Sequence, residues 1–125
     1  MVNFNVDYDE KNDSLFLFDK KNKSIFTLEF GDFDIDLDEK GGIVGLEFSN
    51  ASTFFYTLLK NTSNINTITK VKCFLENTTE SKVIVNNLRK GTIINLFLAS
   101  KKENISTNLT VPRLTNKKEI QQILN

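Results

Sequence analysis

Hydrophobic and polar residues alternate with a period of two over most of the first 48 positions, which is typical of half-buried β-strands. The clearest example is the segment 32–38, where Phe33, Ile35 and Leu37 fall on one face and four Asp on the other. The segment 39–42 holds two Gly and predicts a hairpin turn. The pattern as a whole predicts five strands, at residues 2–8, 15–18, 25–30, 32–38 and 43–48.

A helical period begins after this strand-rich part. Phe54, Phe55, Leu58 and Leu59 share one face of a helix, and the candidate N-caps are Ser49, Asn50 and Ser52. We expect this middle helix to be short, to end near Asn61, and to be followed by a polar linker at 61–67. Strands are then predicted at residues 68–75 (alone or running into a helical turn), 83–88, 92–99 and 105–111.

A closing helix is predicted from about Asn116, because Glu119 follows three residues later as in a capping box. The fold class is therefore α+β, mainly antiparallel β-sheet built of meanders and hairpins, with a short middle helix and a C-terminal helix. Residues 1–60 form an acidic meander and residues 67–125 a basic β-rich extension. Each part is small for an independent core, so we expect them to pack as one compact unit.

Composition excludes several chemistries. The chain has no His and one Cys, so Ser-His-Asp and Cys-His catalysis and His-ligated zinc are impossible. The glycines match no phosphate-binding loop. We therefore expect no catalytic residues, no cofactor and no enzymatic activity. Cys73 is expected to be a buried core thiol, and the sequence lacks a signal-peptide pattern and a long apolar run, which indicates a cytoplasmic protein.

Charge is divided between the halves although the net charge is zero. Residues 1–52 hold 12 acids and 5 bases, and residues 53–125 hold 4 acids and 11 bases. Each half can simply solvate its own surface. Alternatively, the two can attract each other, within the chain or between the subunits of a homo-oligomer. The basic half could also meet an acidic protein or a nucleic acid, although two Arg give little support for base readout.

The only clustered carboxylates suggest one candidate site. Asp32, Asp34, Asp36 and Asp38 should point the same way along a strand, about 6.5–7 Å apart. This spacing is loose for a calcium ion, whose ligands lie about 2.3–2.6 Å from the metal. A solvated strand face, an acidic stripe that binds a partner, and a metal site remain as three interpretations, and the metal is the weakest.

Two stretches resemble a known family. One begins Tyr8-Asp9 and continues to Asp13-Ser14-Leu15, which is similar to a Tyr-Asp-x-x-x-Asp-x-Leu motif. The other is the hairpin from Asp36 to Glu47 followed by Ala51-Ser52. Together they resemble the domain of unknown function family numbered 2283, over about residues 3–55. Leu46 stands where the family usually has Ile, and Gly42 where many members have a polar residue.

The resemblance implies a fold and no activity. Residues 60–125 resemble the extension of longer, archaeal members. Some bacterial members are encoded beside toxin-like proteins, which implies an antitoxin-like alternative. Our leading expectation is a non-enzymatic protein-binding, adaptor or self-assembling module. The alternatives are a regulator that binds nucleic acid or a toxin-like partner, and an enzyme that works with carboxylates.

Overall fold

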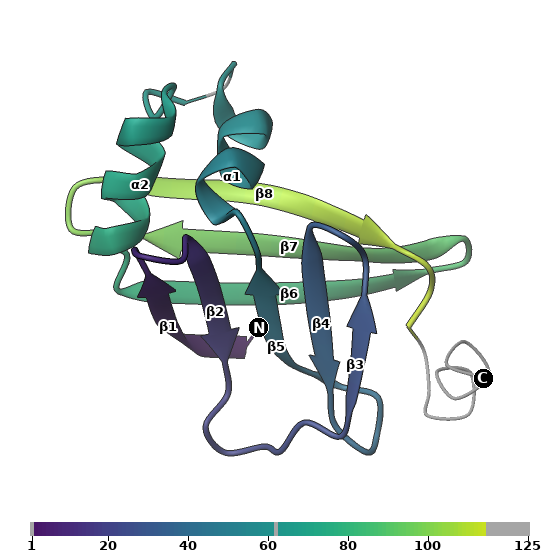
Figure 1. Ribbon diagram of the computed structural model, residues 1–125. Coiled ribbons are helices and arrows are strands. Elements are labelled where there is room, and N and C mark those ends of the chain that lie inside the picture. Colours follow the sequence, from purple (N-terminus) through teal and green to yellow (C-terminus); the bar gives the residue numbers. More distant parts are fainter. Residues whose placement is uncertain (1, 62, 115–125) are drawn as a thin grey trace.

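The computed structural model describes residues 2–61 and 63–114. Eight strands form one antiparallel sheet in the order β3-β4-β5-β2-β1-β6-β7-β8 (Figure 1). The strands are β1 (Val2–Asp9), β2 (Ser14–Phe18), β3 (Phe26–Glu29), β4 (Phe33–Leu37), β5 (Ile43–Phe48), β6 (Glu80–Leu88), β7 (Gly91–Ala99) and β8 (Asn104–Val111). Helices α1 (Ala51–Leu59) and α2 (Ile68–Asn77) connect β5 to β6.

Strand β1 joins the two parts of the sheet. Its residues 5–9 pair with β2, and its residues 2–4 pair with β6. The sheet curves at this strand into a half-barrel, in which β6, β7 and β8 cross behind β1–β5, and α1 and α2 lie together at one open end (Figure 1). The sequence pattern predicted the strands of both parts, and the predominance of antiparallel sheet is confirmed.

The core lies between the two parts of the sheet and draws side chains from both. Leu17, Ile35, Leu46, Ile94 and Leu96 are all fully buried. These residues come from β2, β4, β5 and β7, and the structure places them in a single hydrophobic cluster. Burying a large aliphatic side chain contributes about 1.5–3 kcal/mol to the stability of the fold. The shared core therefore stabilises both parts together.

An aromatic group seals the core below α1. The rings of Phe48 and Phe55 lie 5.1 Å apart, and those of Phe48 and Phe54 lie 5.4 Å apart, between centroids. Phe33 contacts the same group from β4, 5.9 Å from Phe54. Phe55 is thus fully buried in the core, and Phe54 packs against the core while staying partly exposed.

Residues 68–75, predicted as a strand, instead lie in helix α2. Thr67 caps this helix, because its side-chain oxygen accepts a hydrogen bond from the Lys70 N–H at 3.1 Å. Val71, Phe74 and Leu75, spaced by three and four positions, turn inward as the buried face. The β-branched residues near its start suggested a strand, but packing of this helical stripe decides the structure.

The predicted C-terminal helix from Asn116 lies outside the residues that the structure describes. Over the described part of the chain, neither helix is long and apolar enough to cross a membrane. The described chain ends at Leu114, whose N–H donates a 2.7 Å hydrogen bond to the Thr92 hydroxyl. This bond fixes the segment that follows β8 against the start of β7.

Candidate functional site

The motif residues gather in two places, which we name by their members. The cap cluster consists of Tyr8, Asp13 and Ser52. The acidic face consists of Asp34, Asp36 and Glu47 on β4 and β5. Both clusters are built around carboxylates, and the hydrogen bonds and charges around each carboxylate indicate its role.

Asp13 caps helix α1 from the turn between β1 and β2. Its carboxylate accepts a 2.6 Å hydrogen bond from the Ser52 hydroxyl and a 3.0 Å bond from the Ser52 N–H. Its backbone oxygen accepts from the Ala51 N–H at 2.9 Å. Asn50, at the N-cap position, has φ +49 and makes no side-chain cap bond. The side chain that caps α1 is thus that of Asp13, which is distant in sequence, and not that of Ser49, Asn50 or Ser52.

Tyr8 completes the cap cluster. Its hydroxyl donates a 2.6 Å hydrogen bond to the Asp13 carboxylate. Burial alone would raise the pKa of Asp13, but the bonds from Ser52 and Tyr8 and the positive charge of Lys72 outweigh it and hold the pKa below its ordinary value. Burial and the same bond to Asp13 raise the pKa of Tyr8. The cluster is a satisfied network that fixes α1 to the sheet.

The acidic face is set by cross-strand register. Asp34 lies directly opposite Glu47 on β5 and opposite Glu29 on β3. Asp36 lies opposite Thr27 and Gly45, and its carboxylate accepts a 2.7 Å hydrogen bond from the Thr27 hydroxyl. Although Asp36 was expected to face outward into solvent, it is only 7% exposed. The register therefore packs acidic side chains against each other on the outer surface of the sheet.

Gly45 makes room for the buried carboxylate. A Cβ atom at this position would stand 2.9 Å from Asp36 Oδ2 and 3.3 Å from the Leu17 carbonyl oxygen. The Asp36 side chain thus lies directly over the bare backbone of β5. The Gly45 of the family-like hairpin is explained by this contact, which only the structure reveals.

Two carboxyl groups of the acidic face, those of Asp34 and Glu47, lie in surroundings that disfavour their charged forms. Burial, then the charges of Glu29 and Asp36, raise the pKa of Asp34 above its ordinary value. Burial, then the charge of Asp36, a side-chain hydrogen bond to Asp36 and the charge of Asp34 raise the pKa of Glu47. A hydrogen bond between two carboxyl groups requires a proton on one of them. Every one of these influences favours the neutral form.

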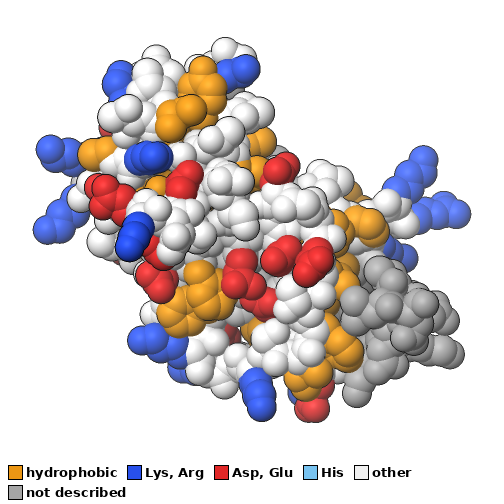
Figure 2. Space-filling model, in the orientation of Figure 1, with side chains coloured by type: hydrophobic (Ala, Val, Ile, Leu, Met, Phe, Trp, Pro, Cys, Tyr) orange, Lys and Arg blue, Asp and Glu red, His pale blue; other side chains and the backbone are white. Residues whose placement is uncertain are grey.

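An aromatic pair borders the carboxylates. Phe16 and Phe18 on β2 stack with their centroids 4.8 Å apart, and both side chains remain half-buried. Phe16 lies opposite Glu47, and Phe18 lies opposite Gly45. Figure 2 shows acidic and hydrophobic side chains side by side over β2, β4 and β5, with the basic side chains towards the periphery. We define the aromatic–acidic surface as the acidic face plus these two rings.

The four-Asp stripe predicted from sequence is not one surface. Asp32 is exposed in the turn before β4, and Asp38 lies after it, where Oδ1 accepts from the N–H groups of Lys40 (2.9 Å) and Gly42 (2.8 Å). Only Asp34 and Asp36 belong to the acidic face. Within residues 2–61 and 63–114, no group of three or more His, Cys, Asp or Glu could hold a metal ion. The stripe therefore divides between turn formation and a carboxyl cluster.

Sequence reasoning missed three members of the aromatic–acidic surface, namely Glu47, Phe16 and Phe18. Glu47 carried a usable signal, because it lies two positions after Gly45 and therefore on the same face of β5. Phe16 and Phe18 carried no such signal, because the run of residues 15–18 is apolar on both faces and only the structure shows that Leu15 and Leu17 are the buried pair.

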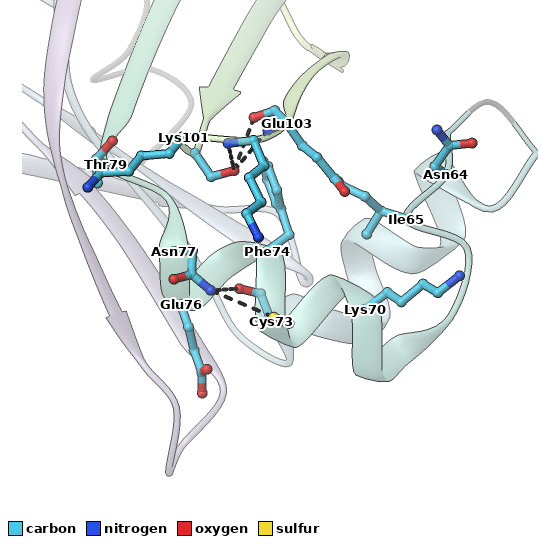
Figure 3. Close-up of a pocket in the computed structure, with 12 residues that line it drawn as sticks. Asn64, Ile65, Lys70, Cys73, Phe74, Glu76, Asn77, Thr79, Lys101 and Glu103 are labelled. Carbon is cyan, nitrogen blue, oxygen red and sulfur yellow. Dashed lines mark hydrogen bonds between the residues drawn. The ribbon is translucent and has the colours of Figure 1, made fainter.

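A groove lies between α2 and the turn that joins β7 to β8 (Figure 3). It has a volume of about 690 Å³, and Phe74 and Ile65 supply its buried residues. Lys70, Lys101 and Glu103 are among the exposed residues at its border. Cys73 lines this groove and is exposed, so the expectation of a buried thiol is wrong. It lies on the face of α2 opposite to Val71 and Leu75, which takes it out of the core.

Comparisons with known proteins agree with the motifs. Residues 5–52 match the model of a family described as "Protein of unknown function (DUF2283)". An uncharacterized protein, MJ0789, of the archaeon Methanocaldococcus jannaschii is 41% identical over 70 residues, which cover 53% of this chain and 60% of that protein. The match thus spans less than two thirds of this relative. No solved structure matches the chain. The segment 5–52 that matches this family model holds both the cap cluster and the acidic face.

Proposed function

We propose that this chain is a non-enzymatic protein-binding module whose aromatic–acidic surface takes a Lys- or Arg-containing segment of a partner protein. The observation that carries the proposal is the cross-strand register that places Asp34, Asp36 and Glu47 together, with the pKa of both Asp34 and Glu47 raised. Like-charged side chains directly opposite each other destabilise a sheet. Such an arrangement is a cost to the fold that a bound cation would relieve.

The two rings add a second attraction for the same kind of ligand. A Lys or Arg side chain over an aromatic face gains about 0.5–1 kcal/mol at an exposed site. Phe16 stands opposite Glu47, so one cation can contact a ring face and a carboxylate together. An approaching positive charge also lowers the pKa of both Asp34 and Glu47, and binding is therefore expected to release protons.

The basic residues give less support to a regulator that binds nucleic acid. Arg89 and Lys90 lie in the turn between β6 and β7, whereas Lys101 and Lys102 lie in the turn between β7 and β8. The nine residues of β7 separate these turns by about 30 Å. Phosphate contacts would thus be split between two ends of the molecule. We propose a cytoplasmic setting, because the exposed free thiol of Cys73 would persist in a reducing compartment.

The test uses a fluorescent peptide with alternating Arg and Gly, read by fluorescence anisotropy. We expect the chain to bind it, with an affinity that falls as salt increases, and the Asp34→Asn/Glu47→Gln variant to bind at least tenfold more weakly. Asp32→Asn is the matched control, since it removes a nearby exposed carboxylate that lies off the surface. Its affinity should stay within twofold of the parent.

Two outcomes would overturn the proposal. One is equal binding of the Arg peptide and an uncharged Gln peptide by the parent chain. The other is unchanged affinity of the Asp34→Asn/Glu47→Gln variant. Binding of a single-stranded RNA oligonucleotide in place of the Arg peptide would favour the nucleic-acid regulator instead.

A further inference from the structure

The two edges of the sheet differ in how they are protected. An edge strand exposes unpaired backbone groups, and native proteins blunt such edges with short strands, charges, bulges or proline. Strand β3 is four residues long and ends in Glu29. Strand β8 spans eight residues, and in the described part of the chain it pairs only with β7. The two edges therefore present very different opportunities for pairing with another strand.

Strand β8 lacks each of the usual protections. Asn104–Val111 holds no charged residue and no proline. Its register with β7 runs without a bulge from the pair Thr92–Val111 to the pair Ala99–Asn104. The single proline of the sequence, Pro112, follows the strand. A regular, uncharged edge of this length is suited to accept a further antiparallel strand.

We propose that this strand is a second copy of β8, which pairs with the first about a twofold axis through Thr107. In that register Ile105 lies opposite Leu109 of the second copy, on the face that is buried in each chain. On the outer face, Ser106 lies opposite Asn108 of the second copy, and Asn104 lies opposite Thr110. Within residues 104–110, the apolar pair therefore meets on the buried face and polar positions meet on the outer face, while Val111 lies at the end of the paired stretch, opposite Glu103 of the second copy.

Electrostatics favours a copy of the same chain as the occupant. The edge carries no charge that would repel its own copy, and the whole chain has a net charge of zero. A twofold axis is the commonest symmetry of homo-oligomers, and it requires this kind of self-complementary surface. Because three strands (β1, β6 and β7) lie between β8 and β2, the nearest strand of the aromatic–acidic surface, the dimer would leave both copies of that surface free. The inference does not depend on what that surface binds.

Sedimentation velocity across a dilution series tests the dimer. We expect the parent chain to form a dimer at micromolar concentration. The variant Ser106→Lys/Asn108→Lys places Lys opposite Lys across the axis and should raise the dimer dissociation constant at least tenfold. Thr53→Lys/Asn86→Lys adds the same charge at exposed positions on α1 and β6 and should leave it unchanged. Circular dichroism and thermal melting verify that both variants fold.

A monomer at all concentrations in the parent chain would overturn the proposal, as would a dimer that the β8 variant leaves intact. The register has its own test in a Cys73→Ser background. Thr107→Cys should form a disulfide between copies upon oxidation, because paired antiparallel Cα atoms lie about 4.5–5.5 Å apart. Thr110→Cys should not, since two copies of residue 110 lie on opposite sides of the axis. Equal cross-linking at both positions would contradict the register.

Discussion

The cap cluster and the acidic face use the same functional group with opposite results. In the cap cluster, the Asp13 carboxylate faces two hydroxyls and a backbone N–H, and its pKa is lowered. In the acidic face, the Glu47 carboxyl faces Asp36 and Asp34, and its pKa is raised. Both clusters lie in the segment that matches the family model.

The difference between them separates stability from binding. A carboxylate surrounded by hydrogen-bond donors stabilises the folded chain, because its charged form is more favourable there than in the unfolded chain. A carboxylate surrounded by other carboxylates lowers the stability of the folded chain until a positively charged group binds beside it. We therefore assign a structural role to the cap cluster and propose the binding role for the acidic face.

The largest expected effect comes from breaking the cap cluster. Asp13→Ala removes the acceptor for Ser52 and Tyr8 and also places Ala at φ +51, where a Cβ is disfavoured. Loss of a cap costs about 0.5–2 kcal/mol, and unpaired buried hydroxyls add to it, so we expect a loss of about 2–3 kcal/mol. Urea denaturation measures it. Asp13→Asn, which keeps an acceptor and tolerates positive φ, should lose less, and equal losses for both would contradict the account.

The next effect concerns the floor of the acidic face. Gly45→Ala places a Cβ against the Asp36 carboxylate, and overpacking of this kind costs about 1–3 kcal/mol. In an Asp36→Ala background the penalty should fall, because the nearest obstructing atom is gone, although the Cβ of residue 36 and the Leu17 carbonyl oxygen remain 3.3 Å away. A double-mutant cycle measures the coupling. Additive effects of the two substitutions would show that Asp36 is not what requires Gly at this position.

The smallest effect has the opposite sign. Asp34→Asn/Glu47→Gln should raise stability at pH 7 by about 0.2–1 kcal/mol, since it removes repulsion across strands. In the parent chain, a raised folded-state pKa means that stability increases as the pH falls from neutral towards the ordinary Glu value of 4.5. The variant should lack most of this increase. Parallel pH profiles for the two proteins, followed by thermal melting, would refute the cost that we attribute to the acidic face.

Local pattern was sufficient for most strands. Period-two alternation located residues 32–38, 83–88 and 92–99 because each strand has one face on the core. It failed at α2, where Ile68 and Thr69 favour a strand locally while Val71, Phe74 and Leu75 pack as a helical stripe. That choice depends on packing between α2 and the rest of the core, which a single sequence window does not contain.

The sites were harder to predict because both depend on pairs of residues that are distant in sequence. Asp13 and Ser52 are 39 positions apart, and no local pattern indicates that one caps the other. The alternation in residues 32–38 correctly separated Asp from apolar residues, but register with β3 and β5 decided that Asp36 is buried against Gly45. Exposure of a polar strand face thus cannot be derived from the strand alone.

The most direct measurement is a carboxyl NMR pH titration of the parent chain, with and without the Arg-Gly peptide. Our account predicts that Asp13 titrates below and Glu47 above its ordinary value, and that the peptide lowers the pKa of Glu47 while that of Asp13 stays fixed. A Glu47 that titrates at its ordinary value would contradict the claim that the acidic face binds a cation. So would a Glu47 whose pKa does not change when the peptide is saturating.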